Sequence, residues 1–218
     1  MSRTAAEILT RLIAFDTVSH KSNLPLIAWI EEYLEGHGVA SHRVYDETGE
    51  KANLIATIGP DDVAGIVLSG HVDVVPVEGQ PWSTNPFEAT VIDGKMYGRG
   101  SSDMKGFCAC VLAAVPDMRA ATLKTPLHLV FSYDEEIGCI GVRGALREIK
   151  DWPLKPRACI VGEPTMMQVV IGHKTKQSWR VTVRGKTGHS SLAPNYVNAV
   201  EYAARLTTFI SDIGRDFA

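Results

Sequence analysis

Short, almost wholly apolar runs separated by helical patterns constrain the fold of this chain more than any other feature. Three of these runs are GIVLSG at 65–70, LHLVFSY at 127–133 and ACIVG at 158–162. A strand that is apolar at successive positions is buried on both faces, which is typical of parallel sheets covered by helices. The sequence therefore predicts an α/β fold with a mixed, largely parallel sheet.

Further helices and strands are predicted around these runs from the spacing of apolar residues. We expect helices at about 4–16, 24–38, 105–120 and 141–150, and strands at 41–46 and 53–59. Gly38 fits the C-terminal cap of the second helix. The stretch FEATVIDGKMYGRG predicts a hairpin that turns at Asp93 and Gly94, because Asp-Gly pairs favour two-residue turns.

The texture of the sequence changes after about residue 174. KQSWRVTVRGK at 176–186 alternates like a half-exposed strand, and NAVEYAARLTTFISDIG at 198–214 has a helical pattern. One strand and one helix bury too little apolar surface to form a core by themselves. We therefore expect a main domain at 1–174 and the beginning of a second, incomplete domain at 175–218, in a fragment of a longer protein.

Composition limits the classes of function. A formal net charge of -3 with both signs mixed provides no basic stripe for nucleic acid and no polybasic segment for a membrane surface. No run reaches the roughly 20 apolar residues of a membrane span, and Glu7 and Arg11 interrupt the N-terminal helix, unlike a signal peptide. The four cysteines lack C-x-x-C spacing, which favours buried thiols in a reducing compartment. We expect a cytoplasmic protein whose partners are small solutes.

Acidic and histidine side chains follow the apolar runs where each predicted strand ends, or precede a helix. They are His71, Asp73, Asp103, Asp134, Glu135, Glu136 and Glu163. Taken alone, each has a plain alternative, such as a hydrogen-bonded histidine, an acidic turn in water or, for Asp103, a helix N-cap. Ligand sites of open α/β sheets lie at the carboxyl ends of the strands, so we expect these side chains to converge. Converging carboxylates repel one another unless a cation lies between them, so the set predicts a metal site.

The donor types indicate which metal and which chemistry to expect. Histidine and carboxylates without thiolates suit zinc, cobalt or manganese. Asp73 can accept a hydrogen bond from the ring nitrogen of His71 that does not bind metal. A bridging aspartate would hold two ions roughly 3.5 to 4 Å apart, an arrangement used for hydrolysis. In the DEE sequence one glutamate can bind metal while its neighbour acts as general acid and base.

Five stretches occur in the order SGHVDVVPVEGQPWSTNPFE, DGKMYGRGSSDMKG, SYDEEIGC, IVGEPT and GKTGHSSLAP. They resemble the metallopeptidase family of aminoacylases, succinyl-diaminopimelate desuccinylases, glutamate carboxypeptidases and acetylornithine deacetylases, and are most similar to the last branch. The resemblance implies hydrolysis of N2-acetyl-L-ornithine to L-ornithine and acetate in arginine biosynthesis. A desuccinylase, aminoacylase or dipeptidase, or a non-catalytic metal-binding member, are the alternatives.

Carried over residue by residue, the resemblance implies a catalytic domain at 1–174 with two divalent ions, zinc or cobalt. His71 and Glu163 would bind one ion and Glu136 the other, with Asp103 bridging both. The peptide bond between Asp103 and the following methionine would be cis.

The resemblance also assigns catalytic residues. Glu135 would be the general acid and base, and Asp73 would orient the metal-binding histidine. His189, otherwise an N-terminal residue of a helix, would reach from a lid and dimerisation domain into the partner subunit's site and stabilise the oxyanion. A homodimer is therefore expected. The family supplies a further metal-binding histidine after the lid, so these 218 residues alone are expected to be inactive.

A few other residues are expected to contribute little chemistry. Lys105 would only begin a helix, and Trp82, Pro86 and Phe87 would pack within a loop. His173 could contact substrate near the second domain.

Overall fold

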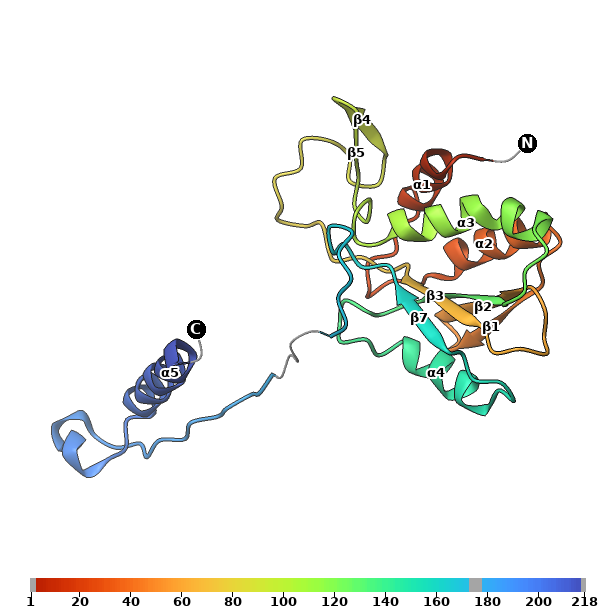
Figure 1. The fold of residues 1–218 in the computed structure, drawn as a ribbon. Coiled ribbons are helices and arrows are strands. Elements are labelled where there is room, and N and C mark those ends of the chain that lie inside the picture. Colours follow the sequence, from red (N-terminus) through yellow and green to blue (C-terminus); the bar gives the residue numbers. More distant parts are fainter. Residues whose placement is uncertain (1–2, 173–177, 217–218) are drawn as a thin grey trace. The chain divides into compact units, whose positions relative to one another are not determined.

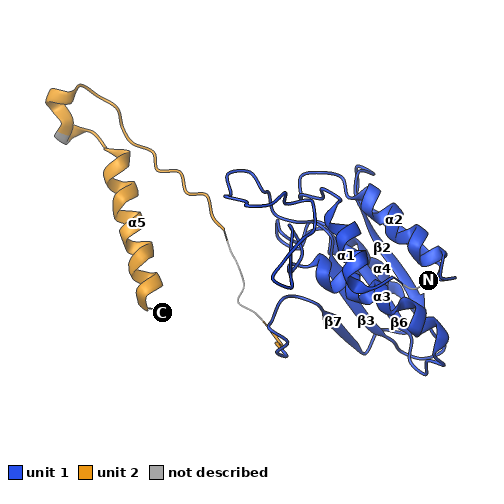
Figure 2. Cartoon of the chain, turned by 90° about the horizontal axis from the view of Figure 1, so that it is seen from above, with its two compact units in different colours: residues 1–169 blue, residues 170–218 orange. Residues whose placement is uncertain are grey.

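The computed structural model describes residues 3–172 and 178–216, which divide into two compact units, Met1–Val169 and Val170–Ala218 (Figure 2). The expected boundary between residues 174 and 175 falls within 173–177, outside the described residues. The suggested substrate contact of His173 lies outside them as well.

A five-stranded sheet with strand order β1-β2-β6-β3-β7 forms the centre of the first unit (Figure 1). Its strands are β1 (Ser41–Tyr45), β2 (Ala52–Ile58), β3 (Ile66–His71), β6 (Leu127–Ser132) and β7 (Ala158–Val161). β3 pairs in parallel with β6 and β7, whereas β2 is antiparallel to β1 and β6. Within this sheet only β2 runs against the others, so the predicted mixed, largely parallel α/β fold is confirmed.

Helices cover both faces of the sheet (Figure 1). On one side lie α1 (Ala5–Ile13), α2 (Leu24–Glu35) and α3 (Lys105–Ala120), and on the other lies α4 (Val142–Asp151). Leu129 and Phe131 of β6 pack in the core beneath the first three helices, whereas Val130 packs with Ala145 of α4. This two-sided burial explains why LHLVFSY is apolar at successive positions. The predicted helices are confirmed, with small differences at their ends.

Two turns test the predictions for glycine. The expected hairpin is present as β4 (Thr90–Ile92) and β5 (Lys95–Tyr97), and Asp93 and Gly94 between them have φ values of 50° and 73°. The expected glycine cap at Gly38 is confirmed, because Gly38 N donates to Glu35 O at 2.8 Å and Val39 N donates to Leu34 O at 2.9 Å, which closes the end of α2. Gly38 has a φ of 70° and lies in the turn that follows, where the left-handed conformation favours glycine.

The cysteines are less buried than expected. All four are free thiols, but only Cys108 is buried, and Cys110, Cys139 and Cys159 are exposed. Apolar neighbours in the sequence misled the prediction. A helix or edge strand that is apolar overall still turns some positions toward solvent, as at Cys110 and Cys159, and Cys139 lies in the loop between β6 and α4.

The second unit contains η1 (Ser190–Asn195) and α5 (Ala199–Asp216), which confirms the helix predicted at 198–214. The strand predicted at 176–186 is wrong for its described part, because residues 178–185 form no strand. Lys186 makes an isolated antiparallel bridge with Val197. Alternation of side chains cannot provide the neighbouring strand that must take the backbone hydrogen bonds.

Across the two described ranges, no helix combines the length and the apolar character needed to cross a membrane.

Candidate metal centre

β3 carries the first predicted metal ligand at its carboxyl end. His71 is the last residue of this strand, and only 2% of its side chain is exposed. The backbone beyond it is also fixed, because Val72 N donates to Ser132 O at 2.8 Å. Gly70 allows the strand to approach α3 closely, since a Cβ at this position would lie 2.7 Å from Cys108 Sγ. The sheet and the helix thus hold the imidazole at the edge where the strands end.

Asp103 reaches the same histidine from the loop before α3. Its Oδ1 lies 3.1 Å from His71 Nε2, and about half of its side chain is exposed. The Asp103–Met104 peptide bond is cis, as the resemblance implied. The N-cap residue of α3 is Met104, without a side-chain cap, so the capping alternative for Asp103 is wrong.

Glu163 follows β7, the strand beside β3, and completes a cluster of three donors. Its Oε1 lies 3.8 Å from His71 Nε2. One ligand atom from each of His71, Asp103 and Glu163 lies within 4.8 Å of the other two. Bonds from zinc to nitrogen or oxygen are about 2.0 to 2.2 Å long, so small adjustments of these side chains would place all three around one ion.

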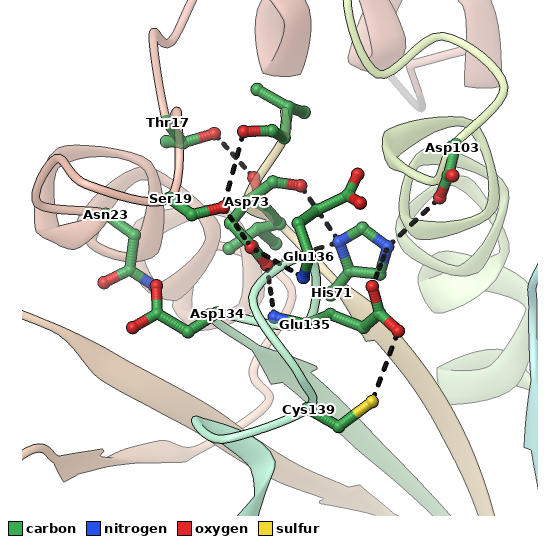
Figure 3. A network of polar contacts seen from close by, with 12 residues as sticks. Thr17, Ser19, Asn23, His71, Asp73, Asp103, Asp134, Glu135, Glu136 and Cys139 are labelled. Carbon is green, nitrogen blue, oxygen red and sulfur yellow. Dashed lines mark hydrogen bonds and ion pairs between the residues drawn. The ribbon is translucent and has the colours of Figure 1, made fainter. Parts of the chain in front are cut away.

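The acidic turn, residues 134–136 after β6, lies against the same histidine (Figure 3). Glu135 Oε2 lies 3.9 Å from His71 Nε2, and its Oε1 accepts from Cys139 Sγ at 3.3 Å. Glu136 also lies beside His71 in Figure 3, but its carboxylate is not part of the cluster formed with Asp103 and Glu163. The structure therefore brings Glu135 and the three clustered donors together and leaves Glu136 further out.

The buried carboxylate of Asp73 joins His71 to the acidic turn. His71 Nδ1 lies 2.9 Å from the backbone oxygen of Asp73 and 3.3 Å from its Oδ1. Oδ1 accepts the backbone N–H of Glu135 at 3.1 Å, and Oδ2 accepts that of Glu136 at 3.3 Å. Ser19 Oγ donates to Oδ2 at 2.7 Å. One carboxylate thus fixes an imidazole ring and the backbone of both glutamates, which is more than the spacing of His71 and Asp73 indicated.

Two opposite pKa shifts make His71 and Asp73 a charged pair. Burial lowers the pKa of His71, but its hydrogen bond to Asp73 and the charges of Asp73, Glu163 and Glu135 outweigh burial and raise the pKa to about 9. Burial raises the pKa of Asp73, but hydrogen bonds from His71 and Ser19 outweigh it and hold this pKa below its usual range. A metal ion could replace the proton on His71 Nε2. The ring would already be oriented for it, because Asp73 contacts the other nitrogen, Nδ1.

The pKa values of Glu136 and Glu163 are raised by burial and by neighbouring carboxylates. Burial and the charge of Asp103 raise the pKa of Glu136. Burial and the charges of Asp103 and Glu135 also raise the pKa of Glu163, against the opposing effect of His71. Carboxylates that repel one another keep their protons to a higher pH, and a divalent cation among them would remove that repulsion. The donor set therefore fits zinc, cobalt or manganese.

Sequence reasoning missed three side chains around the site: Ser19, Lys51 and Lys105. Lys105 does begin α3, but it is fully buried and its Nζ donates to the backbone oxygens of Leu12 at 3.0 Å and Phe15 at 2.8 Å. Burial lowers the pKa of Lys105 to about 8. In the sequence, only the closeness of Lys105 to Asp103 could have indicated that this lysine lies near the site. Its two acceptors are backbone carbonyl oxygens, and a pattern of side chains does not reveal such contacts.

Residues near Trp82 pack as expected for a loop. Arg99 Cζ lies 5.1 Å from the centre of the Trp82 ring, and Trp82 Nε1 donates to Gln80 Oε1 at 3.2 Å. The backbone oxygen of Pro86 accepts from Arg99 N at 2.7 Å. These contacts hold the loop between β3 and β4 to the chain before α3.

His189 lies in the second unit, as the N-cap residue of η1. Its Nδ1 accepts from the backbone N–H of Ser191 at 3.3 Å and lies 2.8 Å from Ser191 Oγ. In the neutral ring this arrangement leaves the proton on Nε2, which is then a hydrogen-bond donor. His189 thus lies at a helix N-terminus, as its alternative interpretation predicted. Its Nε2–H can still donate a hydrogen bond to another group.

The helix-covered sheet and the cluster of one histidine and two carboxylates define an α/β protein with a candidate metal site. Residues 67–216 match the model of the family described as Peptidase family M20/M25/M40, and the chain belongs to this family. The suspected relation to acetylornithine deacetylases is likewise borne out by the relatives.

Curated relatives share this sequence over most of its length. The chain is 34% identical over 217 residues to acetylornithine deacetylase of Proteus mirabilis, covering 96% of this chain and 55% of that protein. It is 38% identical over 184 residues to acetylornithine deacetylase of Klebsiella pneumoniae, covering 84% and 46%. The chain thus spans about half the length of the relatives it matches.

Solved structures share the fold at lower identity. An M20 family metallo-carboxypeptidase from Sulfolobus solfataricus has a TM-score of 0.64 at 22% identity, covering 73% of this chain and 37% of that one. Human carnosine dipeptidase 1 has a TM-score of 0.63 at 22% identity, covering 72% and 38%. These likenesses concern the fold.

Proposed function

We propose that the whole protein hydrolyses the amide bond of N2-acetyl-L-ornithine and releases L-ornithine and acetate in the cytoplasm, as a step of arginine biosynthesis. The observation that carries the proposal is the cluster in which donor atoms of His71, Asp103 and Glu163 lie within 4.8 Å of one another. Glu135 Oε2 lies 3.9 Å from His71 Nε2 at the same place. The two acetylornithine deacetylases at 34% and 38% identity support the choice of substrate.

Two divalent ions, zinc or cobalt, would be held by four side chains. His71 and Glu163 would bind one ion, Glu136 the other, and Asp103 both. When bound, the ions would polarise the acyl carbonyl and make water a nucleophile at neutral pH. The pKa values of Glu136 and Glu163 are raised by burial and then by neighbouring carboxylates, and this supports the assignment because cations would relieve that repulsion.

Glu135 would move the proton. It would accept a proton from the attacking water as the carbon–oxygen bond forms, and return it to the amine nitrogen as the carbon–nitrogen bond breaks. Its backbone N–H is fixed by Asp73 at 3.1 Å, while its side chain touches only Cys139 Sγ among the hydrogen-bond partners in the described residues. A fixed backbone with a weakly held carboxylate suits a group that must bind and release a proton.

His189 would donate Nε2–H to the oxyanion of a partner subunit, which makes the active protein a homodimer. The contact of its Nδ1 with Ser191 N supports the donor form of the ring. One such donor stabilises a transition state by about 3 to 4 kcal/mol. In this proposal residues 1–174 are the catalytic domain, 175–218 begin the lid, and the 218 residues alone turn over little or no substrate.

The test compares Glu135→Ala with Glu47→Ala, which removes an exposed acid outside the site. Both variants are made in a chain of full family length loaded with zinc or cobalt, and assayed with N2-acetyl-L-ornithine, succinyl-diaminopimelate, an N-acetyl amino acid and a dipeptide. We expect acetylornithine hydrolysis that only Glu135→Ala abolishes. If the protein hydrolyses only one of the other three substrates, the proposed substrate is wrong. If it binds metal but hydrolyses none of the four, the proposal that it is an enzyme is wrong.

A further inference from the structure

Lys51 directly precedes β2 and contacts oxygen atoms of two residues that are distant in the sequence, Ser19 and Asp134. Its Nζ donates to both carboxylate oxygens of Asp134, at 2.6 and 2.8 Å, and to the backbone oxygen of Ser19 at 2.5 Å. All three donor hydrogens of the ammonium group are thus used. The nitrogen also lies 5.9 Å from the centre of the Tyr133 ring.

The ion pair of Lys51 and Asp134 is shielded from water. The two side chains are only 16% and 8% exposed, whereas those of the surface pair Lys21 and Asp16 are 42% and 35% exposed. A charge left without its partner in such a place is strongly unfavourable, while an exposed pair contributes little. Removing the Lys51 ammonium should therefore drive Asp134 to move toward water.

Movement of Asp134 would reach the acidic turn directly. Asp134 has a φ of 54°, a left-handed conformation that is uncommon outside glycine. From this conformation the next two backbone N–H groups, of Glu135 and Glu136, both point at the Asp73 carboxylate (Figure 3). If Asp134 relaxes to a more common φ, these two N–H groups turn away from Asp73.

The third oxygen ties Lys51 to the other side of the same network. Ser19 gives its backbone oxygen to Lys51 and its hydroxyl hydrogen to Asp73 Oδ2. Asp73 in turn holds the ring of His71. The ammonium group therefore fixes both the segment that orients Asp73 and the turn that carries Glu135 and Glu136.

We propose that Lys51 is a positioning residue, which places Glu135 and Glu136 through Asp134 and through the Ser19 carbonyl without touching metal or substrate. This inference rests on the proposed function of the site. A lysine that merely supported the fold would change stability and leave the geometry of the metal site and the catalytic step intact.

The experiment compares Lys51→Met, Lys51→Arg and the double variant Lys51→Met with Asp134→Asn, with Lys21→Met as the surface control. The first measurement is the visible spectrum and the binding constant of cobalt(II) in the 218-residue chain, which report coordination without turnover. We expect Lys51→Met to change the spectrum and to weaken cobalt binding about 10-fold, within the range for residues that support ligands. Lys51→Arg and the double variant should recover most of this loss, and Lys21→Met should resemble the parent.

The second measurement is the kinetics of the same variants in the chain of full family length. We expect Lys51→Met to lower kcat about 10-fold or more with a small change in KM, because the proposed base is displaced while the substrate pocket stays. Recovery in the double variant would support positioning, because the buried carboxylate no longer needs a cation.

The outcomes separate the two proposals. Absence of turnover in the parent would overturn the proposed function, while the cobalt measurements would still decide the role of Lys51. Parent-like cobalt spectra and kcat in folded Lys51→Met would refute positioning. If circular dichroism shows that Lys51→Met does not fold, Lys51→Gln, a milder change that also removes the positive charge, is measured in its place. Parent-like cobalt spectra and kcat in folded Lys51→Gln would then refute positioning.

Discussion

Replacing Asp73 by asparagine removes one charge from a carboxylate that serves four groups. Oδ1 accepts from Glu135 N and faces His71 Nδ1, while Oδ2 accepts from Ser19 Oγ and Glu136 N. An asparagine amide has one oxygen and one NH2 group, so only one of these two positions can still accept. In either orientation of the amide, one backbone N–H of the acidic turn faces an NH2 group.

The size of the effect follows from that mismatch. A buried N–H left without an acceptor costs about 1 to 3 kcal/mol, so Asp73→Asn should lower the free energy of unfolding by this amount. If the NH2 group faces His71, it donates to Nδ1 and leaves the proton on Nε2, the nitrogen that must bind metal. Loss of a carboxylate behind a metal-binding histidine typically weakens metal affinity 10- to 100-fold, or about 1.4 to 2.8 kcal/mol.

Two assays on the 218-residue chain test this prediction. Urea unfolding of the metal-free protein gives the stability change, and competition with a chromophoric chelator gives the zinc affinity. Asp62→Asn is the matched control, because it makes the same chemical change at an exposed position. A zinc affinity for Asp73→Asn equal to that of Asp62→Asn would show that Asp73 does not orient His71 for metal binding.

Three further predictions concern the pH, the metal cluster and the core. In the metal-free protein, the pKa of His71 is about 9 in the folded state, against a usual 6.5. Protonated His71 therefore stabilises the folded state by at most about 3 kcal/mol. This stabilisation is complete below pH 6.5 and is lost as the pH rises through 9. Urea unfolding with EDTA at several pH values measures this loss, and zinc should reduce it. Glu163→Gln should leave the metal-free protein as stable or more stable, since burial and the charges of Asp103 and Glu135 disfavour the ionised Glu163 carboxylate. The same variant should lower the thermal shift caused by zinc. Phe131→Ala should lower the free energy of unfolding by about 3 to 5 kcal/mol in denaturant titrations, because Phe131 is 2% exposed in the core.

The part of the site that lies on strand ends could be predicted from the sequence. His71 and Glu163 end or follow neighbouring strands, and the apolar runs before them show where those strands stop. Asp103 was harder to place, since an acid before a helix is usually a cap, and only the neighbouring family motif indicated otherwise. In a parallel sheet the carboxyl ends of neighbouring strands lie side by side, so residues at these ends come together regardless of the loops that connect the strands.

The supporting contacts could not be predicted, for a physical reason. Lys51 contacts Ser19 and Asp134 across 32 and 83 residues of sequence, and one of its acceptors is a backbone oxygen. Periodicity reports which face of an element is buried but not which distant chain lies against it. The same limit applies to the strand expected at 176–186, whose described residues 178–185 form no strand, because alternation in the sequence does not specify a partner strand.

Three consecutive acids can share one turn because they point to different partners. Asp134 meets a lysine, Glu135 and Glu136 give their backbone N–H groups to Asp73, and the side chain of Glu135 faces the His71 imidazole. The left-handed φ of Asp134 separates these directions, so each negative charge has a donor or a cation of its own except that of Glu136. Burial and the charge of Asp103 raise the pKa of Glu136, and under the proposed function a metal ion would supply the cation for this carboxylate.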